Sequence, residues 1–401
     1  MKVLMINIVC GSGSTGRIVA DMWSLLKEQG HEAKIAYGFG TGTRVAQEDM
    51  FRFNTKSGYY RHNIAAKLTD RTGLYSARQT KRLVEYIKRY DPDVIHLHNL
   101  HGYYINYEVL FDYLAQSGKP VVWTLHDCWA FTGHCAHFAA AGCEQWKTHC
   151  SECPLLKEYP VCYLSGDVYN NFETKKKAFT SLGNMTIVTP SKWLAEFVGK
   201  SFLNEYPIRV IHNGIDLSLF KPIPTDFKKE QGFENKTMVL AVANVWSEKK
   251  GLSDVLKLSE MLGEDYQVVA VGLSEKQAES MPENIVAIQR TSSVEELAEI
   301  YSAADVFVNT SYEDTFPTVN LEALACGTPV VTYATGGSPE SINDSCGLVV
   351  PCGDCEALKD AVLQVKNIRP FSSELCRCRA ECFNKDEKFE EYIELYERLV
   401  K

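Results

Sequence analysis

TSYEDTFPTVNLEALACGTPVV, residues Thr310–Val331, is the stretch that decides the fold. It follows Asp305–Asn309, an apolar run typical of a buried parallel strand. Pro317 suits the first position of a helix, where its missing N–H is no loss, and Gly327 suits the residue that ends one. Because Pro329–Thr332 has the pattern of another β-branched strand, the stretch predicts a strand, a loop, a helix and a strand in succession.

The start of this helix predicts an anion-binding site. Unpaired N–H groups and a partial positive charge meet there, so we expect a phosphate over four residues, Phe316, Pro317, Thr318 and Val319. Two acids flank these residues, Asp314 and Glu322, eight positions apart. An ionised carboxylate only accepts hydrogen bonds, which fits the hydroxyls of a sugar or a ribose. A phosphate with hydroxyls on either side indicates a nucleotide sugar.

Strand and helix patterns alternate along the 401 residues and predict two α/β domains, each with a parallel sheet. We expect the first domain over residues 1–215 and the second over residues 216–385, with the Pro-rich segment Phe220–Pro224 as the linker. The apolar run Met1–Cys10 is too short to span a membrane and lacks a cleavage site. It therefore predicts the first strand of a cytoplasmic protein.

The motif around Asp314 resembles the signature of the family-4 glycosyltransferases, retaining enzymes of the GT-B fold in which two Rossmann-like domains face a central cleft. Asp314–Pro317 corresponds to the family's Glu-x-Phe-Gly loop, and Leu321–Gly327 to its Leu-Glu-Ala-Met-Ala helix. Pro190–Leu194 and Val210–Asp216 match the family's domain junction. The resemblance also implies that a C-terminal helix, residues 386–401, crosses back to the first domain.

The same resemblance assigns roles on the donor side. Asp314, or Glu313 displaced by one position, would hold the transferred sugar, and Glu322 would hold the ribose. Lys250 would neutralise the charge that builds up on the leaving diphosphate. No nucleophilic side chain and no catalytic metal are expected, because retaining members are thought to react on one face while the departing phosphate takes the acceptor's proton.

One residue of the family's pattern is missing. The family's phosphate-binding Arg is replaced by Val245. Either Lys249 or Arg17 substitutes for it, or the phosphate is stabilised less.

A Gly-rich loop, Gly11–Gly16, follows the first strand and matches the Gly-x-Gly-x-x-Gly pattern of dinucleotide sites. That pattern also needs an acid at the end of the second strand, and Ala36–Gly38 contains none. In the resembling family this loop faces the donor's distal phosphate, which gives Gly13 and Gly16 a donor-binding role and lets Arg17 add a bidentate partner. A purely structural turn is the alternative.

His126 directly follows the predicted strand Pro120–Leu125, so its side chain should reach the rim of the cleft. A single histidine in such a place is often a hydrogen-bonded structural residue, but the family has a matching histidine on the side of the transferred sugar. We therefore expect His126 to act in the site, with His98, Asn99 and Asp127 on the acceptor side.

A Cys-rich insert follows, over about residues 128–162. Four of its thiols have spacings that would close a structural zinc site, and they are Cys135, Cys143, Cys150 and Cys153. Buried free thiols or disulfides are the alternatives, and reduced thiols are the default without a signal peptide.

Nine Lys and Arg residues lie between Lys56 and Arg89, against two acids, Asp70 and Glu85. This surplus predicts either contact with anionic lipid at the inner membrane face, contact with a phosphorylated acceptor, or a solvated helix face. Aromatic residues do not alternate regularly with the basic ones, so nucleic acid is not expected as a partner.

The resemblance implies an enzyme that moves a sugar, with retained configuration, from a nucleotide diphosphate sugar to a saccharide or lipid-linked acceptor in cell-surface polysaccharide or glycoconjugate synthesis. A sugar-nucleotide epimerase of the same fold is one alternative. A non-catalytic protein that binds sugar nucleotides or glycans is another, because the phosphate-binding Arg is absent.

Overall fold

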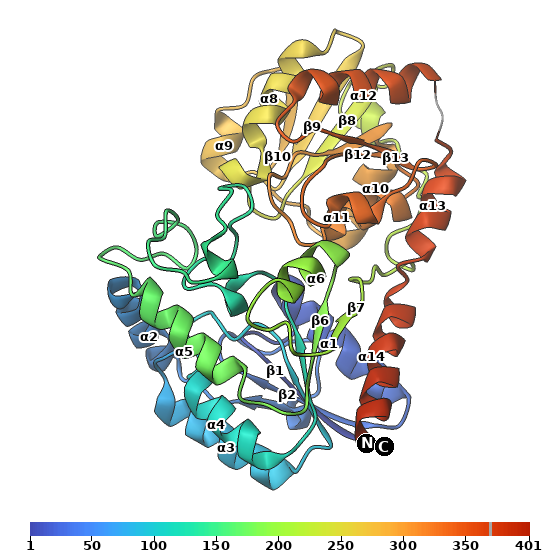
Figure 1. Ribbon diagram of the computed structural model, residues 1–401. Coiled ribbons are helices and arrows are strands. Elements are labelled where there is room, and N and C mark those ends of the chain that lie inside the picture. Colours follow the sequence, from blue (N-terminus) through green and yellow to red (C-terminus); the bar gives the residue numbers. More distant parts are fainter. Residues whose placement is uncertain (369–370) are drawn as a thin grey trace. The chain divides into compact units, whose positions relative to one another are not determined.

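The computed structural model describes residues 1–368 and 371–401, and it forms two compact units (Figure 1). The first unit contains Met1–Ile211 together with Phe389–Lys401, and the second contains His212–Lys388. The sequence predicts a boundary after residue 215, whereas the units divide after Ile211. The Pro-rich segment is not the linker: it lies within the second unit, because Phe220 is buried in that unit's core.

The first unit is built on a seven-stranded parallel sheet with the order β3-β2-β1-β4-β5-β6-β7. Its strands are β1 (Lys2–Asn7), β2 (Glu32–Tyr37), β3 (Met50–Arg52), β4 (Val94–Leu97), β5 (Val121–Thr124), β6 (Met185–Thr189) and β7 (Ile208–Val210). Its helices are α1 (Gly13–Glu28), α2 (Lys56–Thr69), α3 (Ala77–Tyr90), α4 (Tyr107–Ser117), α5 (Val168–Phe179) and α6 (Lys192–Gly199).

Strand β1 shows why this sheet is covered on both faces. Its side chains from Val3 onward are buried, and the apolar ones alternate between two cores, with Val3 and Met5 in one and Leu4 and Ile6 in the other. The first of these cores also contains residues of α1 and of the C-terminal helix α14 (Lys385–Val400), and the second contains residues of α3, α4 and α5. In register, Lys2 lies opposite Glu32, and Val3 lies opposite Val94.

One part of the first unit differs from the sequence prediction. After the strand Lys34–Tyr37 the sequence pattern predicts a helical region through Tyr90, and the structure places there the short strand β3 followed by two helices, α2 and α3. The break falls between Asp70 and Ser76, which both have positive φ and so cannot continue a right-handed helix. Strand β3 has only three residues, too few to give an alternating pattern.

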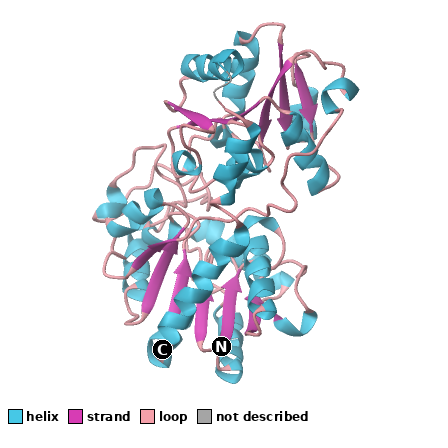
Figure 2. Ribbon diagram, turned by 90° about the vertical axis from the view of Figure 1, so that its right-hand side faces the viewer, coloured by secondary structure: helices cyan, strands magenta, loops and turns pink. Residues whose placement is uncertain are grey.

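The second unit is built on a six-stranded parallel sheet with the order β10-β9-β8-β11-β12-β13. Its strands are β8 (Thr237–Val242), β9 (Tyr266–Val271), β10 (Ile285–Ile288), β11 (Val306–Asn309), β12 (Val330–Tyr333) and β13 (Gly347–Val350). Its helices are α7 (Phe227–Glu230), α8 (Leu252–Met261), α9 (Glu275–Glu279), α10 (Val294–Ala303), α11 (Thr318–Ala325), α12 (Cys355–Ile368) and α13 (Ser373–Glu381), and helices flank the strands of both units in Figure 2.

Both sheets are doubly wound, which confirms the predicted α/β class. The chain builds outward in one direction from β1 and in the other from β4, and likewise from β8 and β11. In open parallel sheets, ligands bind at the carboxyl ends of the strands where the winding reverses. The loops after β1, β4, β8 and β11 are therefore the places to look for a site in each unit.

In the described part of the chain, no helix has both the length and the apolar character required to cross a bilayer.

Candidate active site

The loop after β8 carries Lys250 to the reversal point of the second sheet. Lys250 ends a short 3-10 helix, η4 (Glu248–Lys250), and the next residue, Gly251, has a φ of +70°. A Cβ atom at Gly251 would lie 2.2 Å from the carbonyl oxygen of Thr310, so only glycine lets this loop approach the end of β11 so closely. The Thr310 hydroxyl donates to the carbonyls of Lys250 and Gly251 at 3.0 Å and holds the loop there.

The structure pairs Lys250 with Asp314, a contact that the sequence does not predict. Lys250 Nζ lies 2.6 Å from Asp314 Oδ2, and both side chains are only partly exposed. The other carboxylate oxygen, Oδ1, accepts the N–H of Phe316 at 3.3 Å. The pair thus joins the loops after β8 and β11, the two loops between which the winding reverses.

The backbone of Asp314 is fixed from a third side by the loop after β12. Gly337 donates its N–H to the carbonyl oxygen of Asp314 at 3.1 Å. Gly336 has a φ of +55°, and a Cβ atom there would lie 1.7 Å from the same oxygen. Any larger residue at Gly336 would therefore displace Asp314.

The helix start predicted from Pro317 is present, displaced by one residue. Pro317 is extended and acts as the N-cap of α11, so Thr318 is the first helical residue, with Val319 after it. No side chain caps this end, and the first turn contains no acid. Phe316 is buried beneath it. The positive end of the α11 dipole is thus available to an anion, and Gly327 ends the helix region with a φ of +84°.

Glu322, one turn further along α11, accepts a hydrogen bond from the hydroxyl of Tyr301 on α10 at 2.9 Å. Tyr301 is fully buried. Burial, and after it the nearby charge of Glu322, raises the pKa of Tyr301 well above its usual range, so the phenol remains a proton donor to Glu322. Lys249 and Glu313, the other candidates on this side, lie in the same two loops as Lys250 and Asp314.

A buried network of amides and hydroxyls holds α11 in place, and the sequence prediction missed it. Asn309, at the end of β11, donates to the side-chain oxygen of Asn320 at 2.8 Å. Asn320 in turn donates to the hydroxyls of Ser338 and Ser341 at 2.9 Å. Asn320 is fully buried, and its amide between the apolar residues Val319 and Leu321 is the signal that could have indicated this role.

In the first unit, the Gly-rich loop forms a tight turn into α1. A Cβ atom at Gly11 would lie 2.0 Å from the carbonyl oxygen of Thr43, and Gly13, which begins α1, has a φ of +65°. Gly16 is buried against Val9. Arg17 is exposed, and the N-cap residue of α1 makes no side-chain capping hydrogen bond. This helix start can therefore also accept an anion.

His126 belongs to a chain of neutral histidines. Its Nε2 lies 3.1 Å from Nδ1 of His98, and the ring of His98 lies 4.0 Å from that of His96. The two ring nitrogens of His96 bond the hydroxyls of Thr124 and Tyr396. Burial lowers the pKa of His126 to about 4 and that of His96 to about 3, so both imidazoles are uncharged at neutral pH.

The other acceptor-side candidates have defined partners. Asp127 bonds His101 at 2.7 Å and accepts the N–H of Trp129 at 2.9 Å. Burial alone would raise the pKa of Asp127, but the nearby His101 holds it below its usual range. The carbonyl of Asn99 accepts the hydroxyl of Tyr104 at 2.8 Å. His98 is buried, so it can influence a ligand through its hydrogen bond to His126.

The four cysteines predicted to close a zinc site line one small cavity, beside His134 and Trp146. Cys135, Cys143, Cys150 and Cys153 are free thiols. The hydrogen bond from Cys135 lowers the pKa of Cys153 to about 6. Within residues 1–368 and 371–401, no three Cys, His, Asp or Glu side chains are already arranged to hold a metal ion. A structural zinc therefore stays a prediction.

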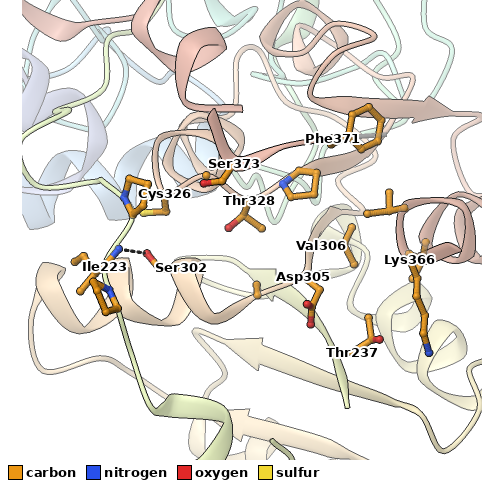
Figure 3. Close-up of a pocket in the computed structure, with 17 residues that line it drawn as sticks. Ile223, Thr237, Ser302, Asp305, Val306, Cys326, Thr328, Lys366, Phe371 and Ser373 are labelled. Carbon is orange, nitrogen blue, oxygen red and sulfur yellow. Dashed lines mark hydrogen bonds between the residues drawn. The ribbon is translucent and has the colours of Figure 1, made fainter. Parts of the chain in front are cut away.

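A cavity of about 510 Å³ also opens in the second unit, shown in Figure 3. It is lined by Thr237, Asp305 and Val306, which lie where β8 and β11 begin, and by Ile223, whose N–H donates to Ser302 at 3.1 Å. These are the amino ends of the strands, so this cavity is at the edge of the sheet opposite Lys250 and Asp314.

Two doubly wound parallel sheets define the GT-B class of glycosyltransferases, and solved structures of that class resemble this chain. The sucrose-phosphate synthase of Thermosynechococcus elongatus has a TM-score of 0.70 at 18% identity, covering 100% of this chain and 99% of that one. The Anabaena protein HepE, solved in complex with UDP-glucose, has a TM-score of 0.69 at 14% identity, covering 99% of this chain and 100% of that one.

The chain belongs to glycosyltransferase family 4. The model of that family, "Glycosyltransferase Family 4", matches residues 15–219, and the model "Glycosyl transferases group 1" matches residues 223–378. A relative from Escherichia coli (strain K12), the colanic acid biosynthesis protein WcaC, named as a glycosyl transferase, is 26% identical over 100% of both chains. The protein is thus a glycosyltransferase, as the sequence predicts.

Proposed function

We propose that this enzyme transfers a sugar, with retained configuration, from a nucleotide diphosphate sugar to a saccharide or lipid-linked acceptor. The observation that carries the proposal is the Lys250–Asp314 pair at the reversal point of the second sheet, next to the open start of α11. The pair and the helix start offer a cation, dipolar N–H groups and a carboxylate at the carboxyl ends of β8 and β11. A diphosphate and the hydroxyls of a sugar need these groups.

In the proposed reaction the bond between the sugar's anomeric carbon and the diphosphate oxygen breaks, and a bond from the acceptor's hydroxyl oxygen forms on the same face. The acceptor's proton goes to the departing diphosphate. Lys250 and the first N–H groups of α11 stabilise the negative charge that grows on this leaving group. Asp314 accepts hydrogen bonds from the transferred sugar, and Glu322, aligned by Tyr301, accepts them from the ribose.

Neutral His126 contributes a hydrogen bond without a charge. Its low pKa keeps the imidazole uncharged, so it does not compete with Lys250 for the diphosphate. We propose that the transfer needs no metal ion, because Lys250 and the α11 dipole supply the positive charge that the leaving group requires. Gly13, Gly16 and Arg17 are proposed to meet the donor's distal phosphate.

Two relatives support the choice of substrates. HepE has been solved with UDP and with UDP-glucose, which favours a nucleoside diphosphate sugar as donor. WcaC takes its name from colanic acid biosynthesis, which favours a role in making a cell-surface polysaccharide.

The first experiment is a thermal-shift screen of the full chain against nucleoside diphosphates and their sugars, since a ligand that binds only the folded state raises the melting temperature. We expect one nucleotide to raise it, and the Lys250→Met variant to reduce the shift. Lys257→Met, an exposed lysine on α8, is the matched control and should leave the shift unchanged. The proposal is wrong if no nucleoside diphosphate and no nucleoside diphosphate sugar raises the melting temperature of either protein.

Product analysis then separates the proposed transferase from the two alternatives. Incubation with the bound sugar nucleotide and no acceptor should give no isomer of the donor, whereas an epimerase would produce one. A binding protein would retain its thermal shift, unchanged in Glu322→Ala, and release no nucleotide with any acceptor.

A further inference from the structure

Helix α2 exposes an apolar stripe on the first unit. Tyr60, Ile64 and Leu68 are 49%, 61% and 45% exposed, and they follow each other at intervals of four residues, so they share one face of the helix. The opposite face is buried through Gly58, His62 and Ala66. Large apolar side chains in a continuous stripe, unlike isolated ones, indicate a surface that meets something apolar.

The segment directly after the Cys-rich insert extends this stripe beyond the end of α2. Tyr163 donates its N–H to the carbonyl of Lys67 at 2.8 Å, which fixes this segment against the last turn of the helix. Tyr163 and the next residue, Leu164, are 58% and 60% exposed. The ammonium groups of Lys67 and Lys157 lie 6.0 Å and 5.9 Å from the centre of the Tyr163 ring. Two segments far apart in sequence thus present apolar side chains beside basic ones.

Charge on this surface is mainly positive. Residues 56–69 contain no Asp or Glu, and Lys56 and Arg61 are exposed along α2. Asp70, which follows the helix, is buried and bonded to His134, and Asp167 lies 3.9 Å from Arg71. Glu158 is the exposed acid next to Lys157. An exposed apolar stripe flanked by Lys and Arg, with tyrosines at its ends, suits the boundary between the headgroups and acyl chains of an anionic bilayer.

We propose that Tyr60, Ile64, Leu68, Tyr163 and Leu164, with Lys56, Arg61 and Lys67 around them, form a surface that docks on an anionic lipid bilayer. The apolar side chains enter the boundary between headgroups and acyl chains, and the basic side chains pair with lipid phosphates. With 14 residues, α2 is too short to span a membrane, so it lies on the bilayer. This inference goes beyond the proposed function, because it concerns where the enzyme works and not the bond that it forms.

Vesicle sedimentation of the full chain tests the proposal. We expect the protein to sediment with vesicles that contain about a third phosphatidylglycerol and to remain in solution with pure phosphatidylcholine, because basic side chains attract anionic lipid. Raising the salt concentration to about 0.5 M should weaken the binding to phosphatidylglycerol at least several-fold, since salt screens exposed charges.

The double variant Ile64→Asp, Leu68→Asp should lower the apparent affinity for these vesicles at least tenfold. The matched control is Leu375→Asp, which changes an equally exposed leucine of the second unit and should sediment like the wild type. Circular dichroism and the nucleotide thermal shift should be unchanged in both variants, since all three side chains are exposed. These two measurements separate a failure of the docking surface from a failure of the donor site.

Two outcomes would overturn the proposal. In one, the wild type does not sediment with anionic vesicles, or the double variant binds them as tightly as the wild type does. In the other, the wild type forms dimers in solution that the double variant abolishes while vesicle binding is absent, which would make this surface a contact between copies of the chain.

Discussion

The two units place their candidate groups in opposite electrostatic settings. In the second unit, Lys250 and Asp314 are charged, partly exposed and only 2.6 Å apart. In the first, His126, His98 and His96 are buried, and their pKa values are lowered mainly by that burial, so they are neutral. A charged pair is suited to a diphosphate, whereas neutral imidazoles are suited to hydrogen bonds with uncharged hydroxyls. The candidate groups of the two units therefore differ in the chemistry that they can perform.

The largest expected effect comes from removing the charge in the second unit. Lys250→Met should lower kcat/KM by roughly 100- to 1,000-fold, as the loss of one preorganised group that stabilises developing charge does in other enzymes. Steady-state kinetics with the identified donor measure this, and Lys257→Met should retain normal values. Near-normal kinetics in Lys250→Met would mean that Lys249 or Arg17 carries the diphosphate instead.

A smaller loss is expected from the neutral side. His126→Ala should lower kcat by about twofold to tenfold, because one neutral hydrogen bond to the substrate, worth about 0.5–1.5 kcal/mol, is removed. His126→Gln, which can still donate a hydrogen bond, should recover part of the rate. If the two variants are equally slow, the histidine acts by a means other than a neutral hydrogen bond.

Asn320 tests how firmly α11 must be held. Asn320→Ala should lower the free energy of unfolding by about 1–3 kcal/mol, because Asn309, Ser338 and Ser341 lose buried hydrogen-bond partners. Urea denaturation measures this change. Asn63→Ala, a partly exposed position on α2, is the control and should stay within about 0.5 kcal/mol of the wild type.

Stability should also depend on pH through the buried histidines. The pKa of His126 falls from about 6.5 when unfolded to about 4 in the fold. As the pH drops, the unfolded chain therefore binds a proton at a higher pH than the folded chain does. The free energy of unfolding should fall between about pH 6.5 and pH 4, by about 1.4 kcal/mol for each unit of pKa difference. His126→Gln should flatten this part of the curve of urea midpoints against pH, and an unchanged slope would contradict the neutral assignment.

The Cys-rich insert allows a test of the predicted zinc site. If Cys135, Cys143, Cys150 and Cys153 draw together around zinc, metal analysis of the purified protein should give one zinc per chain. Cys153→Ser should lose the metal and lower the melting temperature, whereas Cys378→Ser, an exposed cysteine, should keep it. A wild type that contains no zinc would leave four free thiols as the correct description.

The sequence predicts the fold well because the signals of a parallel α/β sheet are local. Buried strands such as β8 and β11 are short apolar runs, and Gly251 and Gly327 stand where the backbone needs positive φ. Motifs in the loops that follow these strands and in helix α11 likewise predict the candidate residues Lys250, Asp314 and Glu322.

What the sequence does not predict depends on contacts between distant segments. The Lys250–Asp314 pair joins residues 64 positions apart, and the hydrogen bond between Tyr301 and Glu322 joins two helices. The linker prediction failed for the same reason, because a Pro-rich composition cannot reveal that Phe220 packs into the core of the second unit. These contacts follow from tertiary packing and leave no periodic pattern in the sequence.

The C-terminal helix has a consequence for how the protein is made. Tyr392 and Tyr396 of α14 are buried in the first unit, where the Tyr396 hydroxyl bonds His96 and the Tyr392 hydroxyl bonds Thr124. Ribosomes synthesise these residues after the whole second unit. The first unit therefore cannot complete its interior until the second unit has been made, and His96 gains its Tyr396 partner only after that.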